Sequence, residues 1–139
     1  MRTFAYIVFI IHVVFELIFG ASAFLSGASS SQSAEQIAQQ SVQVTIAFRF
    51  LGSALLALGV LGAVVVFVAG VQSATAKYIA IGFAAFHGLG AVGSLWSAAP
   101  TFEVYSQPLA LGALVLHGLL ALGFAAVALL MKTEDRASR

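Results

Sequence analysis

Apolar residues run along this chain in four long stretches that short polar segments separate. A helix needs about 20 predominantly apolar residues to cross the hydrocarbon core of a bilayer, and each stretch reaches about that length. The pattern predicts an all-α fold, a bundle of four transmembrane helices at about residues 4–25, 34–69, 77–97 and 108–131. These helices take up most of the chain, so residues 1–139 are interpreted as a single integral membrane domain.

Capping residues define the expected course of the second helix. Ser33 with Gln36 three residues later fits a capping box, and no helix-breaking residue lies between Gln36 and Arg49. We therefore expect this helix to begin near Ala34, outside the membrane, and to run without interruption to about Ala69.

The other helix ends have similar signals. Gly70 is expected to end the second helix, and Ser73 or Thr75 can cap the third. Pro108 suits the first turn of the fourth helix, with a polar cap ahead of it at Ser106 or Gln107.

Basic residues indicate how the helices are oriented. They precede the first helix, lie between the second and third, or follow the fourth: Arg2, Lys77, Lys132, Arg136 and Arg139. The other two loops, at about residues 26–43 and 97–107, contain no lysine or arginine. Because cytoplasmic loops carry the excess of basic residues, both termini are predicted to be cytoplasmic. We expect a multi-pass protein of a bacterial inner (cytoplasmic) membrane.

Composition narrows the classes of function. Hydrophobic residues make up 61% of the chain and charged residues 8%, which leaves too few polar groups for the surface of a soluble domain. The chain has no cysteine, so disulfides, thiolate chemistry and cysteine-ligated metal sites are excluded. A net charge of +1 gives no sign of the basic surface with which proteins bind nucleic acids. The expected partners are the lipid bilayer and either other membrane subunits or further copies of this chain.

The first apolar stretch also has features of a signal peptide. Arg2 precedes it, and Ala21-Ser22-Ala23 has the small-x-small form of a cleavage site. His12 and Glu16 interrupt its apolar core, so we interpret it as a transmembrane helix.

Five ionisable residues lie inside the apolar stretches: His12, Glu16, Arg49, His87 and His117. Such groups are unfavourable in hydrocarbon and often mark functional sites. They share helix faces with small residues, which is typical of helix–helix contacts. At 1.5 Å per residue, Glu16, His87 and His117 fall at a similar depth. We therefore predict a buried polar layer near the middle of the membrane, with Arg49 reaching toward Glu16 from the outer side.

Each polar group has two interpretations. His87 and His117 can hydrogen-bond across two helices, or they can bind a cofactor as the axial ligands of haem or another macrocycle. Arg49 can extend to the interface or pair with Glu16. His12 and Glu16 can form a local i, i+4 contact, or they can relay a proton or bind a small molecule. The sequence predicts no separate metal-ion site.

Several short glycine- and leucine-rich motifs lie between about residues 44 and 131. They are Arg49-Phe50-Leu51-Gly52, Leu55-Leu56-Ala57-Leu58-Gly59, Gly88-Leu89-Gly90, and Ser94-Leu95 followed by Pro100. With these motifs the chain resembles the DoxX-like superfamily of small four-helix membrane proteins. The resemblance implies a four-helix membrane bundle that is sometimes an accessory subunit of redox enzymes. It implies no catalytic residues.

The loops are too short for a recognisable soluble catalytic or nucleotide-binding site, which favours a non-enzymatic role. The sequence is interpreted as an accessory or assembly subunit of a larger membrane complex. Two alternatives stay open. One is a haem- or pigment-binding electron-transfer subunit that uses His87 and His117, and the other is a proton- or small-molecule-handling protein that uses Glu16 and His12.

Overall fold

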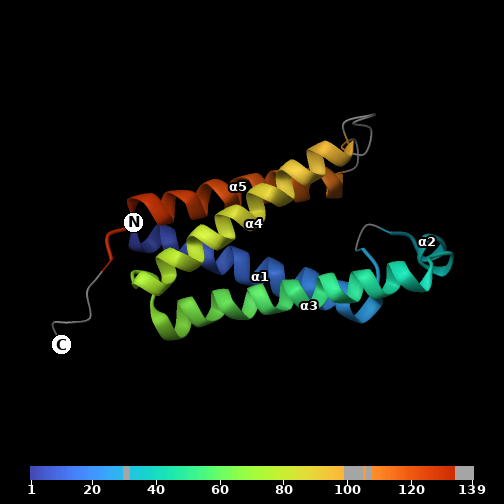
Figure 1. Ribbon diagram of the computed structural model, residues 1–139, viewed down its shortest axis with the longest axis horizontal. Coiled ribbons are helices and arrows are strands. Elements are labelled where there is room, and N and C mark those ends of the chain that lie inside the picture. The colour runs from blue at the N-terminus through green and yellow to red at the C-terminus, as the bar shows by residue number, and fades with distance from the viewer. Residues whose placement is uncertain (30–31, 99–104, 106–107, 134–139) are drawn as a thin grey trace. The chain divides into compact units, whose positions relative to one another are not determined.

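The computed structural model describes residues 1–29, 32–98, 105 and 108–133. These residues form helices and connecting turns, and no strand occurs among them. The elements are α1 (Arg2–Ser26), α2 (Ala34–Ala38), α3 (Val42–Val64), the π-helical segment η1 (Val65–Ala69), α4 (Ala74–Ala98) and α5 (Pro108–Leu130) (Figure 1). The predicted all-α, helical-bundle fold is confirmed.

Within the described residues, four helical segments are long and apolar enough to cross a membrane. They are Arg2–Ser26, Val42–Ala69, Ala74–Trp96 and Pro108–Leu130. Large apolar side chains are exposed along all of them, which suits contact with lipid tails. The structure thus supports a small multi-pass integral membrane protein.

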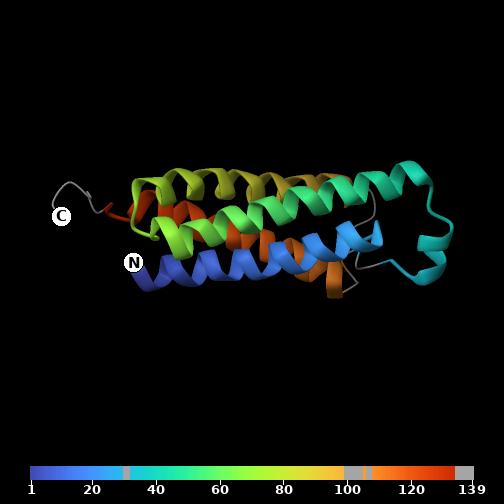
Figure 2. The same ribbon diagram turned by 90° about the horizontal axis from the view of Figure 1, so that it is seen from below.

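The chain divides into two compact units, and its organisation as one domain stays a prediction. The α1–α3 unit consists of Phe9–Val64. The α4–α5 unit consists of Met1–Val8 and Val65–Arg139. Within each unit the two long helices lie side by side (Figures 1 and 2).

Glycines bring the backbones of α1 and α3 together. A Cβ atom added to Gly52 would lie 2.7 Å from the carbonyl oxygen of Gly20 and 2.8 Å from Cα of Phe24. One added to Gly20 would lie 2.8 Å from the amide nitrogen of Leu56. Since real Cβ atoms essentially never come within 3.0 Å of other heavy atoms, only glycine permits this approach. Small residues at close crossings are a common means of helix association in membranes.

The uninterrupted helix predicted from Ala34 to about Ala69 is wrong. The capping box at its start is confirmed, because the Ser33 hydroxyl accepts from the Gln36 amide and the Gln36 side chain accepts from the Ser33 amide. The helix stops at Ala38, however, and residues 39–41 are not helical before α3 begins at Val42.

Tertiary hydrogen bonds explain this break. The Gln40 side chain donates to the carbonyl of Gly27 at 2.7 Å and to the hydroxyl of Thr45 at 2.9 Å. It also accepts from the side chain of Gln32 at 3.0 Å. Ser41 then supplies a new cap, since its hydroxyl accepts from the Val44 amide. These bonds hold residues 39–41 against the end of α1. No local sequence pattern predicts them.

The predicted turn between α3 and α4 is confirmed. Gly70 ends the helix with a φ of 83°, and its amide donates to the carbonyl of Val65 at 2.9 Å, a π-type bond. Ser73 caps α4, because its hydroxyl accepts from the Ala76 amide at 3.0 Å. Pro108 begins α5 as expected. The caps expected at Ser106 and Gln107 lie outside the described residues.

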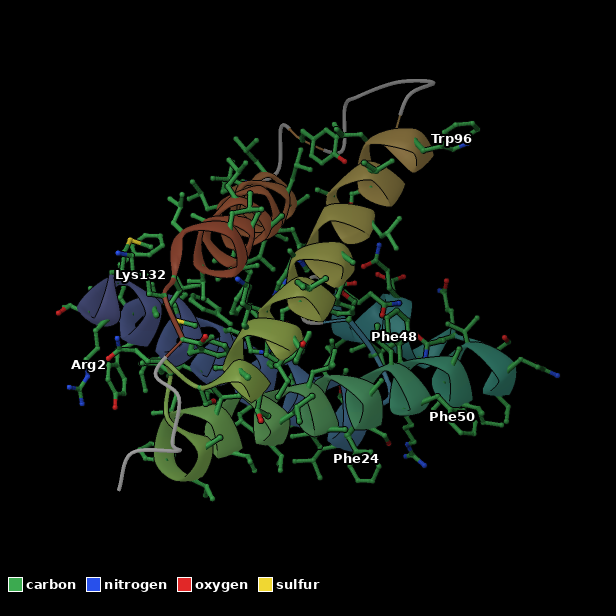
Figure 3. The ribbon with its side chains drawn as sticks, turned by 60° about the vertical axis from the view of Figure 1, so that its left-hand side comes forward. Arg2, Phe24, Phe48, Phe50, Trp96 and Lys132 are labelled. Carbon is green, nitrogen blue, oxygen red and sulfur yellow. The ribbon has the colours of Figure 1, made fainter. Side chains whose placement is uncertain are left out.

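Aromatic residues fill the core of the α4–α5 unit. Phe83 packs edge-on against Phe124 with ring centroids 5.1 Å apart, and both side chains are buried. Leu120 and Val127 extend the buried face of α5. The side chain of Val8 packs beside Gly123, since a Cβ atom added to Gly123 would lie 3.1 Å from Cγ2 of Val8. Arg2 and Lys132 lie at the same end of this unit (Figure 3), the end at which α4 begins.

Candidate functional site

The predicted contact face of α1 is buried along its whole length. Ala5, His12, Glu16, Gly20 and Ala23 are all buried, as the spacing of small and polar residues predicted. His12 has no exposed surface and Glu16 is 5% exposed. The structure thus places an imidazole and a carboxyl group in the interior of an apolar span.

His12 and Glu16 face each other one helical turn apart. The Nδ1 atom of His12 lies 3.7 Å from Oε1 of Glu16. On its other side, Nε2 of His12 lies 3.3 Å from the carbonyl oxygen of Leu58 in α3. Because a carbonyl oxygen only accepts, Nε2 must donate its hydrogen there. Nδ1 is therefore the atom that faces the acid.

Gly62 makes this approach of the imidazole possible. Leu58 and Gly62 are four residues apart in α3, so Gly62 lies one turn beyond the carbonyl that His12 reaches. A Cβ atom on Gly62 would lie 3.0 Å from Cδ2 of His12. Gly62 was not among the sequence-predicted site residues. Its role follows from the structure, because His12 contacts α3 at both Leu58 and Gly62.

His87 in α4 and His117 in α5 form the second polar pair. Their Nδ1 atoms are 2.9 Å apart, a hydrogen bond in which one ring donates and the other accepts. His87 is 1% exposed, and His117 is half-buried. The structure brings these two residues together and matches the interpretation as a hydrogen bond across helices.

Aromatic and glycine residues set the positions of both rings. Phe124 stacks parallel to His87, with an interplanar angle of 3° and centroids 5.9 Å apart. Phe86 packs edge-on against His87 at 5.0 Å and against His117 at 6.4 Å. Gly90 lies beside His117, with 3.5 Å between a Cβ atom added there and Nδ1. None of these three residues was among the sequence-predicted site residues.

A haem between His87 and His117 does not fit this arrangement. Metal–imidazole bonds are about 2 Å long, so two axial nitrogens on opposite sides of an iron are about 4 Å apart, with the macrocycle between the rings. Here the nitrogens are in direct contact at 2.9 Å. Beside His87, a Cβ atom added to Gly88 would lie 4.0 Å from Cβ of Ala121, an ordinary packing contact. Haem ligation stays a prediction that requires the two rings to separate.

Arg49 does not belong to the buried polar layer, which is a correction. Its side chain is exposed, and its Nε lies 3.3 Å from the position of a Cβ atom on Gly27, at the end of α1. Glu16 instead lies opposite Gly59, ten residues further along α3. Ten residues correspond to about 15 Å of helix, more than an arginine side chain spans. Arg49 therefore agrees with the alternative of extension toward the interface.

All buried polar side chains in the described part of the chain are satisfied, since none of their nitrogen or oxygen atoms lacks a hydrogen-bond partner. The convergence of Glu16 with His87 and His117 stays a prediction.

Comparison of the chain with protein-family models, curated proteins and solved structures finds no match.

Proposed function

We propose that this small multi-pass membrane protein handles a proton, or a small molecule that exchanges one, at the pair formed by His12 and Glu16. The observation that supports the proposal is the buried 3.7 Å approach of the imidazole Nδ1 to the carboxyl group inside an apolar helix. Ionisable groups in membrane interiors commonly form proton relays and substrate sites.

The geometry favours one shared proton. With the Nε2 hydrogen directed at Leu58, a neutral His12 turns a lone pair toward Glu16. A proton on the carboxyl group leaves both groups neutral, and a proton on Nδ1 makes an ion pair, so both forms have no net charge. Loss of that proton would leave a net negative charge in a buried site, which is strongly unfavourable. Release is therefore expected to be coupled to the arrival of another proton or of a ligand.

Proton flux in reconstituted vesicles tests this function. Vesicles containing a pH-sensitive dye and the wild-type protein should acidify or alkalinise faster than protein-free vesicles when a potassium diffusion potential is applied. Glu16→Gln should reduce the excess rate by about tenfold or more, because an amide has no transferable proton at this position.

Glu35→Gln is the matched control for this measurement. Glu35 is an exposed carboxylate in α2, so its substitution should leave the flux unchanged. Flux that is equal in wild-type and Glu16→Gln vesicles, or equal in wild-type and protein-free vesicles, would contradict proton handling at Glu16.

A second candidate function is the accessory or assembly subunit, and the surface of α4 favours it. A Cβ atom added to Gly82 or Gly93 would meet nothing within 4 Å, whereas the glycines of α3 are all in close contact with α1. Glycine weakens a helix by about 1 kcal/mol relative to alanine. At Gly82 and Gly93 no close packing within the chain offsets this cost. The same face bears Leu89 and Trp96, and Trp96 points away from the helix (Figure 3). We propose that a transmembrane helix of another subunit covers it.

Substitution of these glycines tests the accessory role. Gly82→Leu combined with Gly93→Leu should abolish co-purification of a partner membrane protein that the wild-type chain retains in mild detergent at a fixed ratio. Val60→Leu, at an exposed site in α3, should retain the partner. A wild-type chain that purifies alone, or only with copies of itself, would contradict this role.

The orientation and cellular location are part of the proposal. Arg2 and Lys132 lie at one end of the α4–α5 unit, which supports placing both termini on the cytoplasmic side. We further propose a bacterial inner membrane as the location. The resemblance to the DoxX-like superfamily is retained as a proposal on the motifs quoted above.

A further inference from the structure

We propose that His87 and His117 form a binding site for a divalent transition-metal ion such as Zn²⁺, coordinated through both Nδ1 atoms. Imidazole is a preferred ligand of zinc, copper, nickel and iron. This inference is independent of the function proposed for His12 and Glu16, because it rests on contacts within the α4–α5 unit alone.

The separation of the two nitrogens is close to that of a metal chelate. Zinc–imidazole bonds measure about 2.0–2.1 Å, and a tetrahedral angle between two of them places the nitrogens about 3.3 Å apart. The observed separation is 2.9 Å. Widening the separation by about 0.4 Å would therefore bring the pair to the spacing of two ligands of one ion. The separation of about 4 Å that haem needs, with the macrocycle between the rings, is not required.

The two rings are held by rigid surroundings. They project from neighbouring helices, so their spacing is set by the packing of α4 against α5. Phe124 stacks on His87, and Phe86 lies against both rings. Preorganised ligands on helices lose little freedom when an ion binds. Zinc sites usually have four ligands, so the remaining coordination positions would be filled by water or by a small ligand.

Binding requires a change of tautomer and no net loss of a proton. In the hydrogen-bonded pair one ring has its hydrogen on Nδ1. Metal ligation needs a free lone pair on both Nδ1 atoms, so that ring must move its hydrogen to Nε2. Both histidines then bind as neutral ligands.

Metal titration of the purified full-length protein tests the proposal. The protein should carry an affinity tag without histidine and should first be treated with a chelator. We expect one Zn²⁺ per chain by elemental analysis, and visible absorption of tetrahedral character when Co²⁺ is added. His87→Gln and His117→Gln should each weaken Zn²⁺ binding by ~100-fold or more, since an amide is a poor replacement for a ligating imidazole.

Glutamine keeps the capacity to hydrogen-bond across the helices, so both variants should fold, and thermal unfolding of each verifies this. Glu35→Gln controls for binding by exposed carboxylates and should leave the Zn²⁺ affinity unchanged. The proposal is overturned if the wild-type protein binds neither Zn²⁺ nor Co²⁺. It is also overturned if a folded His87→Gln/His117→Gln double variant binds Zn²⁺ with wild-type affinity.

Discussion

Gly52→Ala is expected to lower the free energy of unfolding by roughly 3 kcal/mol, near the upper end of the usual range for overpacking. The added methyl group would overlap the backbone of α1 at Gly20 and Phe24. Backbone atoms cannot rotate away as a flexible side chain can, so α1 and α3 would have to separate. Separation weakens the close contacts that hold membrane helices together, since lipid tails already provide an apolar environment. Reversible unfolding in mixed detergent micelles measures the change.

Gly82→Ala provides the matched control. A methyl group there meets nothing within 4 Å. The better helix propensity of alanine should leave stability unchanged or raise it by up to about 1 kcal/mol. Equal losses of stability in the two variants would mean that glycine flexibility, and not the close contact between α1 and α3, determines the effect.

The sequence was sufficient for the elements that depend on local patterns. The apolar stretches predicted the membrane-spanning helices, and the small-residue spacing predicted the buried face of α1. Gly70 and Ser73 likewise marked the turn between α3 and α4. The break at residues 39–41 was missed because Gln40 bonds to groups that are distant in the sequence, and helix propensity contains no information about such bonds.

The candidate site was predictable only in part. The types and depths of His87 and His117 were enough to place them together. The direct hydrogen bond between them depends on ring rotations that Phe86 and Phe124 impose, and these contacts require the positions of two helices. Arg49 was misplaced because its depth depends on which residues of α3 lie opposite α1. That register is set by the contact of Gly52 with Gly20, which sequence spacing alone does not identify.

Phe124→Ala is expected to destabilise the α4–α5 unit by about 2 kcal/mol. Phe124 has no exposed surface, packs edge-on against Phe83 and stacks on His87. In a bilayer the transfer part of a core substitution is small, since the unfolded chain also lies in an apolar medium. The cavity remains: removal of roughly 100 Å³ at about 24 cal/mol per Å³ gives about 2 kcal/mol. Unfolding in mixed micelles measures this loss.

Phe50→Ala is the control that separates the loss of internal packing from the loss of an apolar side chain. It removes the same group from an exposed site in α3 that contributes little to internal packing. It should change the free energy of unfolding by less than about 0.5 kcal/mol. Phe124→Ala should also free the His87 ring to rotate, so Zn²⁺ affinity is expected to fall even where the protein stays folded. Full retention of both stability and metal affinity in Phe124→Ala would show that the ring is not what positions His87. The positions of the two histidine rings would then have to be set by the packing of the helix backbones alone.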